Sequence, residues 1–266
     1  MIHLPDGQTE PRTLVTYVRY PAVGRPGGGD LVGAPPARAA GPFPLIVFGH
    51  GFAVTPAPYA DLLRAWVRAG YVVAAPVFPL ENADAPGGPN ETDLVNQPAD
   101  MRFVIARLVS ASNSHNGPLH GLIDESRIAV AGHSDGAETA LLAAYDPAHH
   151  DARIRAAVLL SGAQIPPGGI AFLHPTAALL ATQGTADTIN PPSITNAFYG
   201  VAPRPKFLLR LLGAEHLPPY TVERPQLSVV ERVTIAFLDH YLRGSPLRPL
   251  LDAGNVPGVA TLLSDP

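Results

Sequence analysis

The chain has 266 residues, of which 46% are hydrophobic and 15% are charged. This composition allows a sizeable buried core and excludes a disordered chain. The formal net charge of −4 argues against nucleic acid or an anionic membrane as the main partner. The absence of cysteine excludes disulfides, thiolate metal sites and a cysteine nucleophile. We expect neither a metal nor a cofactor, and the oligomeric state stays open.

The apolar runs of the chain are as short as strands and are bounded by proline or glycine, so no membrane span is expected. The first six residues, Met-Ile-His-Leu-Pro-Asp, lack the basic start and the apolar core of a signal peptide. We therefore expect a cytoplasmic protein, or a secreted one whose leader has been removed.

The first half of the chain alternates between strand and helix patterns. In order, the patterns predict a strand over 13–21, a loop over 24–44, a buried strand over 45–48, a helix over 58–69, a strand over 71–76, a polar loop over 78–97 and a helix over 98–109. Fully apolar runs such as 45–48 are typical of strands in a parallel sheet with both faces covered.

The second half continues the alternation. The patterns predict strands over 128–131, 155–160, 177–182 and 206–212, and helices over 137–144 and 226–242, the last ending at Gly244. Spacings of roughly 25–30 residues between strands indicate a doubly wound, mostly parallel α/β sheet with helices on both faces. We expect a single domain with its core over about 12–243 and a carboxyl-terminal tail over 244–266.

A Gly-His-Ser-Asp-Gly motif at 132–136 lies between a predicted strand and a predicted helix. A serine flanked by glycines two residues away on each side, at such a corner, is typical of a nucleophile elbow. The turn strains the serine backbone and lifts its hydroxyl out of the sheet. Ser134 is therefore the candidate nucleophile.

A serine nucleophile needs a general base, and that base needs an acid that orients it. In a parallel sheet, reactive groups gather at the carboxyl ends of the strands. The strand ends after Ser134 supply Asp187 and then His216, in the Ser…Asp…His order typical of this fold. Glu215 and Glu138 are alternative acids that we interpret as structural.

The other histidines are weaker candidates for the base. His50 and His133 lie in glycine-flanked turns, where a histidine often only packs and binds the backbone. Adjacent His149, His150 and Asp151 suggest a metal site, but such a polar turn is far more often solvated.

Acyl hydrolysis also needs donors for the developing oxyanion. The backbone N–H of Asp135 follows the nucleophile at a helix amino terminus, and the N–H of Phe52 lies in the loop after the first core strand. The Phe52 ring would form a wall of the acyl pocket, with a purely structural core role as the alternative. An inward Asp135 carboxylate would oppose the oxyanion, so we expect it to point away and to pair elsewhere.

These motifs resemble the α/β-hydrolase superfamily. More narrowly, they resemble the branch that holds dienelactone-hydrolase-like esterases, chlorophyllases and cutinase-like polyester hydrolases. The resemblance spans about 12–242 and is carried by residues 20–22, 44–52, 97–100, 132–136, 184–187 and 213–216. It implies serine carboxylester hydrolysis through an acyl-enzyme, with Phe52 and Asp135 as oxyanion donors.

The chain also departs from parts of this branch. Cutinase-like enzymes usually have methionine where this chain has Asp135, and often tryptophan near Ile165, and they tend to close the carboxyl end with a disulfide that this chain cannot form. Dienelactone hydrolases proper use a cysteine nucleophile. We predict that Phe52, His133 and Ile165 contact the substrate.

The segment 161–176, where many lipases carry a helical lid, is short and rich in glycine and proline. Little or no lid is therefore expected, and the favoured substrate is a short- to medium-chain ester in an open cleft. The loop over 78–97 either rims this cleft or is solvated.

Several alternatives stay open or are disfavoured. A cutinase-like polyester hydrolase acting on a polymeric ester, acyl transfer and amide cleavage fit the same motifs. A non-catalytic binding protein of this fold is disfavoured because all three triad residues are present. A dehalogenase would need aspartate in place of Ser134.

Overall fold

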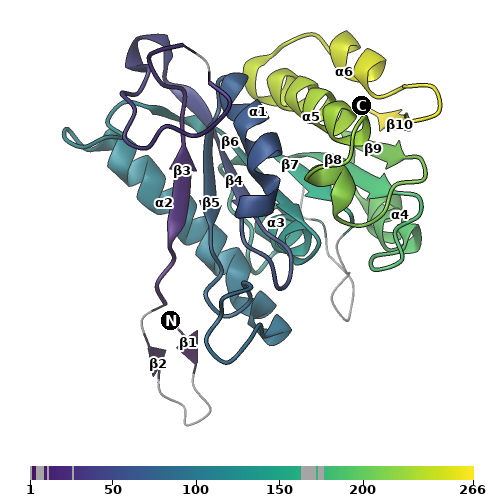
Figure 1. Ribbon diagram of the computed structural model, residues 1–266, viewed down its shortest axis with the longest axis horizontal. Coiled ribbons are helices and arrows are strands. Elements are labelled where there is room, and N and C mark those ends of the chain that lie inside the picture. The colour runs from purple at the N-terminus through teal and green to yellow at the C-terminus, as the bar shows by residue number, and fades with distance from the viewer. Residues whose placement is uncertain (1, 4–8, 11, 26, 163–171, 173–176) are drawn as a thin grey trace.

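An eight-stranded sheet forms the centre of the protein in the computed structural model, which describes residues 2–3, 9–10, 12–25, 27–162, 172 and 177–266 (Figure 1). Its strands are β3 (Thr16–Arg19), β4 (Phe43–Gly49), β5 (Val72–Pro76), β6 (Ile123–His133), β7 (Ile154–Leu160), β8 (Ala178–Gly184), β9 (Lys206–Leu211) and β10 (Ala260–Asp265). They lie in the order β10-β9-β8-β7-β6-β4-β5-β3. Only the edge strands β3 and β10 run antiparallel to their neighbours.

Helices cover both faces of this sheet (Figure 1). One face carries α1 (Ala60–Arg68), α5 (Gln226–Arg243) and α6 (Arg248–Ala253), and the other carries α2 (Gln97–Asn113), α3 (Asp135–Tyr145) and α4 (Pro192–Val201). Successive side chains of a strand point to opposite faces. In β4, Leu45 and Val47 belong to one core and Ile46 and Phe48 to the other. Both faces are therefore apolar, which confirms the predicted doubly wound α/β-hydrolase fold.

Short elements complete the chain. Outside the main sheet, β1 (Ile2–His3) pairs antiparallel with β2 (Thr9–Glu10). The 3₁₀ helices are η1 (Arg38–Ala40), η2 (Ala57–Tyr59), η3 (Glu91–Asn96) and η4 (Pro218–Tyr220). Helix α5 ends at Gly244, whose φ of 72° closes the helix in the left-handed conformation that glycine adopts without strain.

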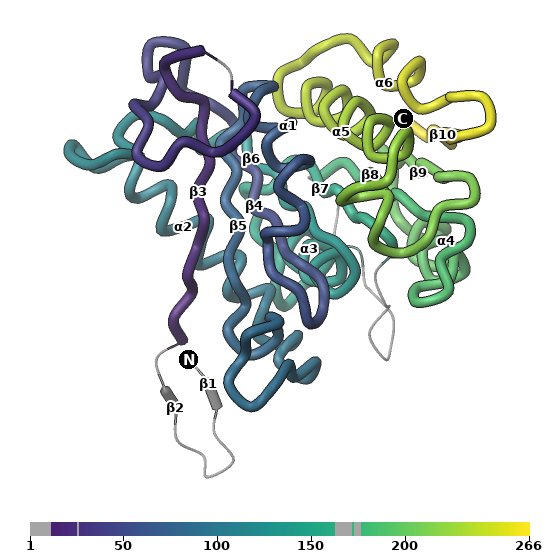
Figure 2. Tube along the Cα trace, viewed as in Figure 1, coloured from purple at the N-terminus to yellow at the C-terminus, as the bar shows by residue number. Residues whose placement is uncertain are grey.

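The structure corrects three expectations. Residues 244–266 are not a tail, because they form α6 and the edge strand β10, which Figure 2 traces in yellow beside β9. Leu250 and Ala260 bury their side chains in the same core as α5. Helix α4 was not predicted, and β6 begins at Ile123, five residues before the predicted strand.

The parallel strands end at one edge of the sheet. The final residues of neighbouring strands pair in register, Gly49 with Gly132 and His133 with Leu160. On the next pair, Gly184 pairs with Leu211. The loops that follow these strands therefore begin side by side. In a parallel sheet, a site at the carboxyl edge is built from such neighbouring loops.

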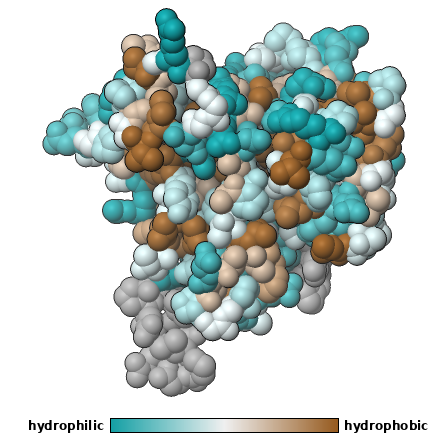
Figure 3. Space-filling model, viewed as in Figure 1, coloured by the Kyte–Doolittle hydropathy of each residue, from teal (hydrophilic) through white to brown (hydrophobic). Residues whose placement is uncertain are grey.

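Figure 3 shows hydrophilic and hydrophobic residues intermixed over one face of the molecule. Within the described part of the chain, no helix combines the length and the apolar character that a membrane crossing would need.

Candidate active site

Ser134 lies at a strained corner between β6 and α3. Its backbone has φ 55° and ψ −120°, a conformation that costs a non-glycine residue free energy and persists only where the surroundings impose it. A Cβ atom on Gly132 would lie 1.9 Å from the Gly136 oxygen, and one on Gly136 would lie 2.2 Å from the Gly49 oxygen. Both flanking glycines are therefore required by backbone-to-backbone contact, as a nucleophile elbow demands.

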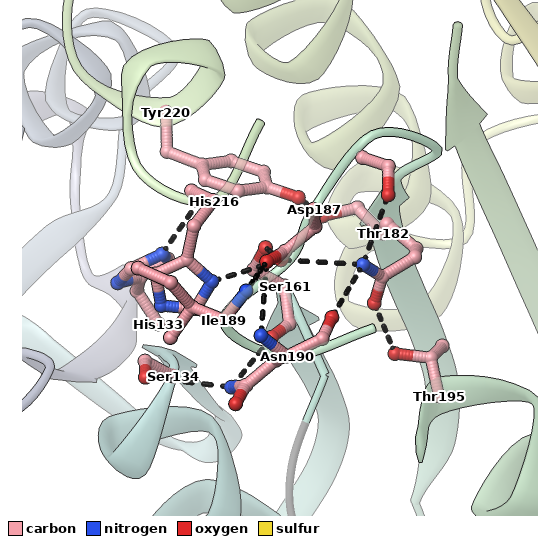
Figure 4. Close-up of polar contacts among 12 residues, drawn as sticks. His133, Ser134, Ser161, Thr182, Asp187, Ile189, Asn190, Thr195, His216 and Tyr220 are labelled. Atoms are coloured by element: carbon pink, nitrogen blue, oxygen red, sulfur yellow. Dashed lines mark hydrogen bonds and ion pairs between the residues drawn. The ribbon is translucent and has the colours of Figure 1, made fainter. Parts of the chain in front are cut away.

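The Ser134 hydroxyl reaches the surface only narrowly, since the residue is 8% exposed. Asn190 Nδ2 donates a hydrogen bond of 3.4 Å to Ser134 Oγ (Figure 4). Among the described residues, no hydrogen bond joins Ser134 to His216. In active sites without substrate such bonds are often long and tighten only in the reacting complex.

Asp187 and His216 form a direct pair. His216 Nδ1 donates to Asp187 Oδ2 at 2.8 Å, and the Asp187 side chain is fully buried (Figure 4). Ser161 Oγ also donates to Oδ2 at 2.5 Å, while Oδ1 accepts the N–H groups of Ile189 and Asn190 at 3.0 and 2.9 Å. Burial opposes ionisation of this carboxyl, but these hydrogen bonds outweigh it and lower the Asp187 pKa.

The loops that carry this pair are packed against each other at their backbones. A Cβ atom on Gly184 would lie 2.4 Å from the Ala214 oxygen. Ala186 N–H donates to the same oxygen at 2.9 Å. The turn after β8 therefore fixes the turn after β9, so that Asp187 and His216 face each other without any contribution from substrate.

The two expected oxyanion donors belong to segments that adjoin Ser134. Asp135 is the first residue of α3, where the helix dipole favours negative charge. Gly51, next to Phe52, packs so closely that a Cβ atom there would lie 3.2 Å from Ser134 Cβ. No acceptor from the described part of the chain binds the N–H of Phe52 or Asp135, and the Phe52 residue is 41% exposed.

The structure gives His133 a different role from the predicted substrate contact. The ring is only 2% exposed. Its Nε2 lies 3.0 Å from the His216 carbonyl oxygen, which can only accept, so Nδ1 accepts from the Tyr59 hydroxyl at 2.8 Å. Burial lowers the His133 pKa to about 3. His133 is thus a neutral support for the backbone of the His216 loop.

His50 is also neutral and structural. The residue is buried, and its Nε2 accepts the Phe78 N–H at 3.0 Å, which places the proton on Nδ1, 2.9 Å from the Gly51 oxygen. Burial lowers its pKa to about 4. His50 therefore joins the loop after β4 to the loop after β5.

The Asp135 side chain turns away from the surface and meets Glu81. Both residues are buried, and neither Glu81 Oε1 nor Asp135 Oδ2 has an N–H or alcohol donor among the described residues. Burial, then the hydrogen bond to Asp135 and its negative charge, raise the pKa of Glu81 to about 9. This raised pKa favours the neutral acid form of Glu81 at pH 7. The loop over 78–97 is thus not simply solvated.

The remaining predicted residues are placed as follows. Glu138 is buried on α3, and Ile165 lies outside the described residues. His149 binds Asp146 of its own turn. Across the described ranges, no cluster of three or more acidic, histidine or cysteine side chains has the arrangement of a metal site.

Several residues that contact this site were not predicted, among them Tyr59, Glu81, Ser161 and Asn190. Ser161 directly follows β7, at the same sheet edge as the other site residues, so its position was a usable signal. Asn190 lies three residues after Asp187, in the same turn. Tyr59 and Glu81 carry no sequence signal, because only the folded chain brings them to the elbow.

The fold and these strand ends define an α/β-hydrolase. A solved structure, "Ferulic acid esterase from Streptomyces cinnamoneus", superposes with a TM-score of 0.66 at 22% identity, covering 88% of this chain and 84% of that chain. No curated protein matches the sequence.

The family model described as Chlorophyllase matches residues 23–162, just over half of the chain. The chain belongs to the chlorophyllase family, which confirms the predicted branch of the superfamily. It is accordingly a hydrolase of the ester-hydrolase kind.

The elbow glycines generate a stability prediction. Gly136→Ala places a Cβ atom 2.2 Å from a backbone oxygen, and we expect it to lower the free energy of unfolding by more than about 3 kcal/mol. Gly200→Ala in α4 is the matched control, because nothing lies within 4 Å of its Cβ position, and it should change stability by less than about 1 kcal/mol. Urea unfolding measures both. Equal effects would contradict the packing described here.

The buried histidines generate a pH prediction. In the unfolded chain an imidazole binds a proton near pH 6.5, but folded His50 and His133 bind one only near pH 4 and pH 3. The unfolded state therefore binds more protons below pH 6.5. As a result, protonation of these two histidines in the unfolded chain lowers the free energy of unfolding as the pH falls toward 4. Long-range ¹⁵N–¹H NMR at pH 5 should show His50 neutral with its proton on Nδ1 and His133 neutral with its proton on Nε2. A doubly protonated ring at either position would refute this.

Proposed function

We propose that the protein is a serine carboxylester hydrolase that acts through an acyl-enzyme on short- to medium-chain esters. The single observation that carries the proposal is the strained Ser134 at the sheet edge where the buried Asp187 holds His216 at 2.8 Å. Membership in the chlorophyllase family supports the ester-hydrolase class.

In the first half of the proposed reaction, Ser134 Oγ attacks the ester carbonyl carbon while His216 Nε2 takes the hydroxyl proton. The ionised Asp187 holds the resulting imidazolium and fixes its Nδ1–H. The N–H groups of Phe52 and Asp135 donate to the oxyanion of the tetrahedral intermediate. His216 then gives its proton to the departing alcohol, which leaves an ester on Ser134.

In the second half, water replaces the alcohol. His216 takes a proton from the water, the resulting hydroxide attacks the acyl carbon, and the Ser134–acyl bond breaks with the proton returning to Oγ. Before attack, Ser134 Oγ must turn from Asn190 Nδ2 toward His216. The weak 3.4 Å contact with Asn190 therefore holds the hydroxyl in a resting position.

Apolar side chains near the site support an acyl group as the bound part. Phe52, beside the elbow, is 41% exposed, and Ile189, next to Asn190, is 69% exposed. Exposed apolar groups of this size beside a buried serine fit an apolar acyl or aryl chain. The comparisons add two named esters to the candidates: chlorophyll, from the family name, and a feruloyl ester, from the similar structure.

In the central test, we expect ester hydrolysis to depend on Ser134. With p-nitrophenyl acetate, butyrate and octanoate, Ser134→Ala and Asp187→Asn should each lower kcat/KM by about 10⁴-fold, because each removes a member of the proton-transfer chain. Chlorophyll, a methyl feruloyl ester and a polyester film belong in the same panel and rank the substrate classes.

The matched control is Ser126→Ala, at the amino-terminal end of the same strand β6 and exposed. It should retain full activity. Activity that survives Ser134→Ala would refute the proposal, and a folded protein inert toward every ester would favour a binding role.

A further inference from the structure

Three segments meet at Glu81, and two of them carry the proposed oxyanion donors. The Glu81 backbone oxygen accepts a hydrogen bond of 3.0 Å from the N–H of Ala53, the residue that follows Phe52. Ala53 has a φ of 55°, so this loop is held in a conformation that alanine rarely adopts. On its other side, the carboxyl group of Glu81 faces Asp135 at the start of α3.

A further hydrogen bond joins the loops around Glu81, since Ala83 N–H donates to the Val54 oxygen at 3.3 Å. Within the second loop, Asn82 Nδ2 donates to the Phe78 oxygen at 2.7 Å. Together with the hydrogen bond from the Phe78 N–H to His50 described above, the bonds between these loops connect residues 50–54 to residues 78–83. A displacement of Glu81 would therefore be transmitted to the Phe52 loop.

The hydrogen-bond pattern places a proton between the two carboxyl groups. Thr139 Oγ1 donates to Gln97 Oε1 at 2.7 Å, so the Gln97 amide nitrogen faces Glu81 Oε2 and donates to it. Glu81 Oε1 and Asp135 Oδ2 are buried, and no other group in the described part of the chain binds them. Two buried carboxylate oxygens without a donor are costly, whereas one shared proton satisfies both.

We propose that Glu81, as its neutral acid, is a positioning residue that holds the two oxyanion donors, Phe52 and Asp135, in place by donating a proton to the Asp135 carboxylate. This inference rests on the proposed function. The donated hydrogen bond keeps the Asp135 side chain turned away from the oxyanion. Loss of the Glu81 proton to solvent puts two carboxylates in contact, which repel each other and spread the two donor segments apart.

Other titratable groups pack around this pair. They are Asp93 of η3, Glu138 of α3, and the Tyr59 hydroxyl, which donates to His133. Asp93 is paired with Arg12, which also binds Asp100 of α2. Burial, followed by the charge of Asp135, raises the pKa of Glu138 to about 7, about two pH units below that of Glu81. Ionisation of Glu138 is therefore a separate step at lower pH, which a Glu81 variant leaves in place.

The test is the pH profile of kcat for p-nitrophenyl butyrate between about pH 6 and pH 10, with Ser134→Ala as the blank for spontaneous hydrolysis. The wild type should lose about tenfold in kcat by pH 10, as expected one unit above the pKa of a required acid, with little change in KM. Glu81→Gln should lack this alkaline loss, because its amide N–H donates to Asp135 at every pH. Asp135→Asn should also lack the alkaline loss. This second variant replaces Glu81→Gln in the test if Glu81→Gln fails to fold.

Asp84→Asn is the matched control, since it removes an exposed carboxylate from the same loop. It should keep the wild-type profile. An alkaline loss that persists in Glu81→Gln and Asp135→Asn, or that is absent from the wild type, overturns the inference while leaving serine-dependent hydrolysis intact. A wild type no more active than Ser134→Ala overturns the proposed function instead.

A second readout needs no activity. A carboxyl group whose pKa is raised by folding contributes stability that is lost as the pH rises from its unfolded toward its folded pKa. The unfolding temperature of the wild type should therefore fall relative to that of Glu81→Gln between about pH 6 and pH 9, while Asp84→Asn stays parallel to the wild type. Parallel curves for Glu81→Gln and the wild type would overturn the shared proton.

Discussion

The close packing of three glycine backbones at the elbow is the constraint on which the rest of the site depends. Gly132 and Gly136 leave no room for side chains and Gly49 leaves little, because β6, α3 and the end of β4 approach to backbone contact. This contact holds Ser134 at φ 55°. It also sets the start of α3 beside the Phe52 loop, so that one packing arrangement positions the proposed nucleophile and the proposed oxyanion donors.

Buried polar groups extend this rigidity to the rest of the site. His133 connects the elbow to the His216 backbone, and Ser161 connects the end of β7 to Asp187. Each group has its hydrogen-bond partners in place before any substrate binds, which is how an enzyme avoids reorganisation during the reaction. The unusual member is Asp135, whose carboxylate beside a proposed oxyanion site is offset by the proton of Glu81.

The sequence predicted what depends on local pattern. Apolar runs located β4–β9, and the strand-end rule selected Ser134, Asp187 and His216 as candidates, which the structure brings to one edge of the sheet. It did not predict Glu81 or Tyr59, because their roles arise from contacts across 54 and 74 positions of the chain. It missed β10 because an edge strand such as Ala-Thr-Leu-Leu-Ser-Asp has one covered face and a weak apolar pattern. For His133 the sequence did not decide between a substrate contact and a packing role, because glycine flanks do not reveal which way a ring points.

The most direct test of the account is covalent trapping of the nucleophile. An alkyl fluorophosphonate reacts with a serine that is activated by a general base, and peptide mass spectrometry locates the adduct. The account predicts one stoichiometric phosphonyl adduct on Ser134, formed quickly in the wild type and very slowly in a variant that lacks the His216 imidazole. An unmodified Ser134, or rapid labelling of another serine, would contradict it.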